Sequence, residues 1–76
     1  MTTREKVVDI LNKIKPAKNL ENVTDIVEGG YLDSFDLMTL IGNLSDEFGI
    51  EFDVNDMTPD NFNSVDAIAA LIEKLK

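Results

Sequence analysis

Three amino acids that carry much of protein chemistry are missing from this 76-residue chain, which contains no cysteine, no histidine and no tryptophan. Without cysteine there can be no disulfide, no thiolate nucleophile and no zinc-finger site. Without histidine, the usual general base near neutral pH and the commonest metal ligand are both missing. Serine–histidine and cysteine–histidine catalysis are therefore excluded, and we expect a protein that is not itself an enzyme.

Positive charge is also scarce, because 7 lysine and arginine residues face 15 aspartate and glutamate residues, which gives a formal net charge of −8. Such a polyanion repels nucleic acid and anionic lipid, so we expect neither as a partner and instead expect proteins with basic patches. The chain is not a disordered acidic tail, since 43% of its residues are hydrophobic and recur periodically.

Long hydrophobic runs are absent as well. The longest apolar stretch, Ala67–Ile72, is far too short to span a membrane. The beginning of the chain becomes charged at Arg4 and contains no signal-peptide core. We therefore expect a soluble, cytoplasmic monomer in which residues 1–76 form one domain.

Apolar residues at helical spacing predict three main helices, over about residues 3–15, 34–48 and 64–75, and Pro59 suits the start of a short fourth helix. Residues 50–54 alternate apolar and polar side chains, but with no second strand to pair with they favour an extended link. The expected core residues of the helices are Val7, Ile10, Leu11, Ile14, Leu37, Leu40, Ile41, Leu44, Phe48, Phe62, Val65, Ile68, Leu71, Ile72 and Leu75.

The first loop, residues 16–32, is too long to be a simple connection. It carries isolated apolar residues that should pin it to the core, namely Leu20, Val23, Ile26, Val27 and Leu32. The predicted fold is all-α, a small bundle of three main helices and one short helix with a long first loop.

Residues 30–36 read Gly-Tyr-Leu-Asp-Ser-Phe-Asp, which resembles the phosphopantetheine-attachment motif Gly-x-(x)-Asp-Ser-Leu of acyl and peptidyl carrier proteins. The resemblance continues through residues 46–50, 52–53 and 58–65, and so extends along nearly the whole chain. Two departures stand out. Phe35 occupies a position where Leu, Met or Ile is usual, and an extra residue separates Gly30 from the Asp-Ser pair.

The resemblance implies an acyl-carrier-protein-like fold and a covalent 4′-phosphopantetheine arm, attached to Ser34 from coenzyme A by a phosphopantetheinyl transferase. Asp33 would support this site by helping to bind the transferase magnesium ion. The chain would then act as a stand-alone carrier of a thioester-bound group between separate enzymes: an adenylating ligase or acyltransferase upstream, and a synthase or transferase downstream. Alternatively, Ser34 is only a helix N-cap, worth about 1 kcal/mol.

Partner recognition is expected along the second helix. Phe35 and Met38 fall outside its buried stripe, and Gly42 lies one turn further along, which indicates an apolar docking surface. Acidic residues that could meet basic partners gather at the helix end and beyond it, at Asp46, Glu47 and Glu51.

The middle of that helix, residues 37–45, carries no charge, which favours an aminoacyl or peptidyl carrier over the carrier of fatty acid or polyketide synthesis. A rival of another class is an acidic helical interaction module that is never modified. Residues 53–64 do not form a calcium loop, because the required glycine and the bidentate glutamate are missing, and no metal site is expected.

Overall fold

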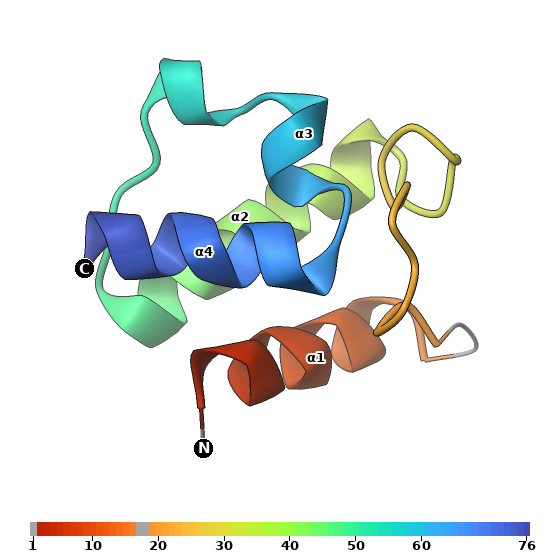
Figure 1. Ribbon diagram of the computed structural model, residues 1–76, viewed down its shortest axis with the longest axis horizontal. Helices are drawn as coiled ribbons and strands as arrows, with labels where there is room; N and C mark the ends of the chain where they lie inside the picture. The colour runs from red at the N-terminus through yellow and green to blue at the C-terminus, as the bar shows by residue number, and fades with distance from the viewer. Residues whose placement is uncertain (1, 17–18) are drawn as a thin grey trace.

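The computed structural model describes residues 2–16 and 19–76, and this part of the chain contains helices, turns and loops but no strand (Figure 1). The α-helices are α1 (Thr3–Ile14), α2 (Ser34–Phe48), α3 (Pro59–Phe62) and α4 (Val65–Leu75), and a short 3-10 helix, η1, spans Val54–Asp56. The predicted all-α architecture is confirmed. Residue 1 of the predicted domain and residues 17 and 18 of the first loop lie outside the described part.

The ends of the three main helices follow from local side-chain chemistry. Thr2, Asp33 and Ser64 are the N-caps of α1, α2 and α4, and the side chain of each accepts a backbone N–H from the first turn of its helix. Helix α2 ends at Gly49, whose φ of +63° lies in the left-handed region that glycine adopts readily.

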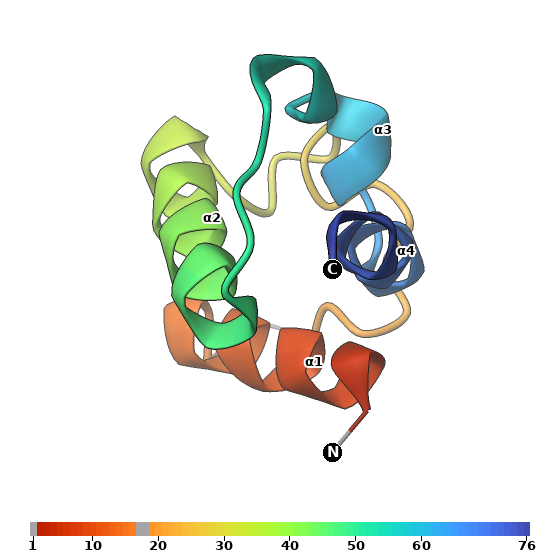
Figure 2. The ribbon, with the colours of Figure 1, turned by 90° about the vertical axis from the view of Figure 1, so that its left-hand side faces the viewer.

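The core lies between the three main helices. Helix α1 packs against both α2 and α4, and α3 packs against α4. Figure 2 shows α2 and α4 on either side of the core, with α1 crossing below them. Helix α2 contributes Leu40 and Leu44, both completely buried. The other buried core residues of the helices are Val7, Ile10, Leu11, Phe62, Val65, Ile68, Leu71 and Ile72.

The long first loop is held against this core, as predicted. Leu20, Ile26 and Leu32 are buried, while Val23 and Val27 are partly buried against the same cluster. Burying a leucine or isoleucine side chain contributes about 1.5–3 kcal/mol relative to exposure, which helps to offset the entropy of ordering a long loop.

The segment between α2 and α3 differs in one respect from the prediction. Residues 50–53 form no strand and Ile50 is buried, as expected for an extended link that closes the core. The following turn, η1, was not predicted. It is closed by Asp53 and Asp56, since the Asp56 carboxylate accepts the Asp53 backbone N–H at 3.0 Å. A turn of three residues is too short to produce a periodic signal in the sequence.

In the part of the chain that the structure describes, no helix is long and apolar enough to cross a membrane.

The two faces of α2 give a direct test of this packing. Leu44 is completely buried, whereas the Met38 side chain lies on the outer face and is 66% exposed. Leu44→Ala should lower the free energy of unfolding by about 2–5 kcal/mol, because it leaves a cavity in the core. Met38→Ala should change it by no more than about 0.5 kcal/mol. Urea melts of both variants would measure this, and equal losses would contradict the assignment of the helix faces.

Candidate functional site

The predicted attachment residue, Ser34, is the first residue of α2 and is exposed. The helix cap is supplied by its neighbour, because Asp33 Oδ1 accepts the backbone N–H of Asp36 at 2.8 Å. Capping therefore does not explain the serine at position 34. Its hydroxyl stands at the surface at the start of a helix that is well anchored in the core.

The two other serines of the chain use their hydroxyl groups within the fold. Ser45 donates a hydrogen bond to the Ile50 carbonyl at 2.5 Å, which fastens the chain after α2. Ser64 accepts the Ala67 backbone N–H at 3.0 Å as the cap of α4. Both are partly buried, so Ser34 is the most accessible of the three serines.

The start of α2 also suits the phosphodiester that attachment would create at Ser34. The backbone N–H groups of the first turn have no partners within the helix, and they give this end a partial positive charge. The Asp33 side chain accepts the backbone N–H of Asp36. The backbone N–H groups of Ser34 and Phe35 remain available near the serine oxygen. An anion bound to that oxygen would meet these donors, so the residues present fit a phosphate ester.

An ion pair fastens the first turn of α2 to the end of α1. Lys15 Nζ and Asp36 Oδ2 lie 2.8 Å apart. Oδ2 is enclosed and accepts no well-formed hydrogen bond, so we regard the contact as mainly electrostatic. Contact with the Lys15 ammonium lowers the pKa of the Asp36 carboxyl, and Asp36 in turn raises the pKa of Lys15. Asp36 therefore does more than add charge to the helix start: it helps to hold Ser34 in place.

Four of the six predicted partner-binding residues share one exposed stripe of α2. Met38, Gly42 and Asp46 follow one another at intervals of four residues, which puts them in a row on the helix surface. Phe35 lies one turn before Met38, and their side chains are 80% and 66% exposed. We call these four residues the α2 stripe. It begins directly beside Ser34.

The other two predicted residues lie elsewhere. Glu47 is turned toward α1, where its carboxylate lies 3.4 Å from Lys6 Nζ. Glu51 is exposed in the link beyond the helix. Asp46 and Glu47 point about 100° apart on the helix, so Glu47 lies beside the α2 stripe rather than on it, although its side chain is still exposed.

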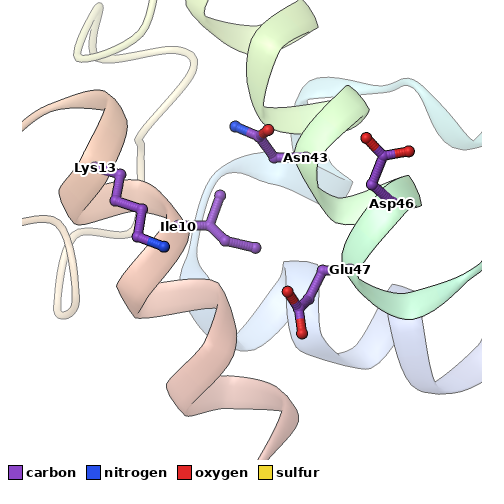
Figure 3. Close-up of a pocket in the computed structure, with 5 residues that line it drawn as sticks. All are labelled: Ile10, Lys13, Asn43, Asp46 and Glu47. Atoms are coloured by element: carbon purple, nitrogen blue, oxygen red, sulfur yellow. The ribbon is translucent and has the colours of Figure 1, made fainter.

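A shallow groove runs between α1 and α2 on the side of Glu47. Figure 3 shows Ile10 and Lys13 of α1 across this groove from three residues of α2, Asn43, Asp46 and Glu47. Its volume of about 260 Å³ is below the 300–1,000 Å³ of typical small-molecule pockets. The groove is therefore a surface depression rather than an enclosed ligand site.

Sequence reasoning missed one residue that bears on the site. Asn63 directly precedes Ser64, the N-cap of α4, and is buried. It holds the loop that leads to Ser34. No local pattern in the sequence indicates this contact, because the residues that it joins are about 35 positions apart.

Comparison with known proteins identifies the family. A family model described as the phosphopantetheine attachment site matches residues 3–72. The D-alanyl carrier protein of Leuconostoc citreum is 32% identical to this chain over 76 residues, which cover 99% of this chain and 97% of the relative. The D-alanyl carrier protein of Leuconostoc mesenteroides subsp. mesenteroides is 30% identical over 76 residues with the same coverage.

These matches extend along nearly the whole chain. The cofactor is a covalently attached 4′-phosphopantetheine group, which holds the carried group as a thioester. The chain thus belongs to the phosphopantetheine-binding carrier protein family.

Proposed function

We propose that residues 1–76 form one carrier domain, that Ser34 bears the 4′-phosphopantetheine arm, and that the cargo is an aminoacyl group. In this proposal the helical bundle supplies recognition and performs no catalysis itself. The bound arm supplies the thiol that this cysteine-free chain lacks, so that an acyl group can be held as a thioester.

Attachment of the arm requires one phosphoryl transfer. The Ser34 oxygen forms a bond to the phosphorus of coenzyme A that bears the pantetheine portion. The pyrophosphate bond breaks, adenosine 3′,5′-bisphosphate leaves, and the hydroxyl proton passes to a base of the phosphopantetheinyl transferase. Such a transfer depends on holding the attacking oxygen in line with the leaving group.

The observation that carries this proposal is the division of roles between two neighbouring residues. Asp33 caps α2, and Ser34 stands exposed at its first position. If the serine hydroxyl also capped the helix, it would have to give up the capping hydrogen bond when it reacts. Asp33 has a second proposed role, since its exposed carboxylate lies next to the reacting oxygen in sequence and could support the transferase magnesium ion.

A mass measurement tests the attachment residue. Wild-type protein incubated with coenzyme A, Mg²⁺ and a promiscuous phosphopantetheinyl transferase should gain the mass of one 4′-phosphopantetheine group. Ser34→Ala should gain none, because it lacks the attacking oxygen, while Ser45→Ala serves as the matched control and should be loaded. If the wild type gained no mass, the unmodified interaction module would be the better account.

The proposed cargo is D-alanine. Both curated relatives carry D-alanyl carrier in their names, and they match this chain over nearly its full length. The uncharged middle of α2 agrees with a carrier whose docking depends more on apolar contact than on a row of acidic residues. The second candidate is an acyl carrier of fatty acid or polyketide synthesis.

Cargo loading distinguishes the two candidates. Arm-bearing protein incubated with ATP, D-alanine and a D-alanine-adenylating ligase should gain the mass of one alanyl group, and hydroxylamine should remove it because the bond is a thioester. The same protein with malonyl-coenzyme A and a malonyl transferase should gain nothing. Malonyl loading without alanyl loading would favour the second candidate.

We assign the α2 stripe, Phe35, Met38, Gly42 and Asp46, to docking of the adenylating ligase. The partner surface that fits it is an apolar depression with a basic edge. Two exposed apolar side chains beside Ser34 would be desolvated on contact, and Asp46 together with the net charge of −8 would attract basic residues. Gly42 carries no side chain, so it leaves the partner free to approach the helix backbone.

Kinetics of aminoacylation test this surface. Met38→Ala should lower kcat/KM of the ligase for the carrier by about fivefold to thirtyfold, which corresponds to an interface loss of about 1–2 kcal/mol, while the melting temperature stays close to that of the wild type. Met57→Ala is the matched control, because Met57 is also an exposed methionine (43%) but lies outside α2. Equal effects of the two variants, or none from Met38→Ala, would contradict this docking surface.

A further inference from the structure

Asn63 stands out as a buried polar residue, only 8% exposed, at the junction of α3 and α4. Its side-chain oxygen accepts the backbone N–H groups of Val27 and Glu28, each at 3.1 Å. Its side-chain nitrogen donates to Glu28 Oε1 at 2.7 Å, and its backbone carbonyl accepts the Ile26 N–H at 2.8 Å. One residue thus holds three consecutive positions of the first loop.

The same loop segment leads directly to Ser34. The Ile26 carbonyl accepts the N–H groups of Tyr31 and Leu32, at 3.1 and 3.4 Å, which closes residues 26–32 into a compact turn. Leu32 is buried, and only Asp33 separates it from Ser34. A short chain of hydrogen bonds therefore connects Asn63 to the position where α2 begins. In Figure 1 this yellow part of the chain lies beside the connection between α3 and α4.

The contact requires an amide at position 63. Two partly buried backbone N–H groups need an acceptor, and the same side chain donates to the carboxylate of the exposed Glu28. An aspartate would keep the acceptor but bring a second negative charge close to Glu28. An alanine would leave two partly buried N–H groups without a partner. Helix capping gives no reason for this asparagine, because Ser64 caps α4.

We propose that Asn63, paired with Glu28, is a positioning residue for the loading of Ser34. The pair fixes the turn of residues 26–32 against the α3–α4 junction and so sets where the first residue of α2 lies relative to the rest of the bundle. This inference rests on the proposed function, since it takes Ser34 as the residue that is modified. A displacement of about 1 Å at a reacting atom can lower a rate by about a hundredfold, so a lost anchor should reduce loading even in a folded protein.

The test measures phosphopantetheine transfer at a temperature well below the melting point of every variant. The four variants are Asn63→Ala, Leu71→Ala, Asn63→Asp, and Asn63→Asp combined with Glu28→Gln. Asn63→Ala should lower kcat/KM for the carrier by about tenfold to a hundredfold. The control is Leu71→Ala, which creates a cavity in the core but removes no hydrogen bond to residues 26–28. It should lose stability as well but load at nearly the wild-type rate. A purely structural role of Asn63 would instead make the two variants load alike.

An exchange of donor and acceptor between the two side chains gives a second measurement. It tests the positioning role of Asn63 even if Asn63→Ala does not fold. Asn63→Asp should load slowly, because it loses the donor and repels Glu28. Asn63→Asp combined with Glu28→Gln restores a donor on the other partner and should recover most of the rate. Failure of this rescue, or wild-type loading by folded Asn63→Ala, would overturn the inference while leaving the proposed function intact. A wild type that accepts no arm would overturn both.

Discussion

The start of α2 has to satisfy two requirements that usually compete. A helix needs a side chain to accept a backbone N–H of its first turn, and serine is among the residues that do this best. A modifiable serine at the same place needs its hydroxyl free. The chain meets both requirements with two adjacent residues, since Asp33 makes the cap and Ser34 stays exposed. The proposed chemistry depends on this division.

Three kinds of contact keep the exposed serine in a defined position. Leu40 and Leu44 anchor α2 in the core, and the Lys15–Asp36 ion pair ties its first turn to α1. Asn63 holds the preceding loop through its side chain and its backbone. The ion pair is partly open to water, so its contribution to stability should be modest and sensitive to salt. The most firmly held part of the site is therefore the buried side of α2.

Much of the fold could be predicted from the sequence because its signals are local. Apolar residues at helical spacing located the three main helices. The isolated apolar residues of the first loop are the ones that hold it against the core. The motif around Ser34 is a continuous stretch of sequence, so it could be recognised before its surroundings were known. The exposure of Phe35 and Met38 followed from helix periodicity alone.

What could not be predicted depends on contacts between distant residues or on very short elements. Lys15 and Asp36 are separated by the whole first loop, and Asn63 lies about 35 positions from the backbone groups it holds. The pairing of Glu47 with Lys6 has the same origin, because it joins two different helices. In each case, the identity of the partner depends on how the helices pack.

Fragmentation mass spectrometry of the arm-bearing protein tests the central claim most directly, because it locates the phosphodiester on the chain. Ser34, Ser45 and Ser64 all lie between Lys18 and Lys74, so one tryptic peptide contains all three serines. Fragmentation of that peptide shows which serine bears the arm. The account predicts the arm on Ser34 alone. An arm on Ser45, on Ser64 or on a threonine would contradict it.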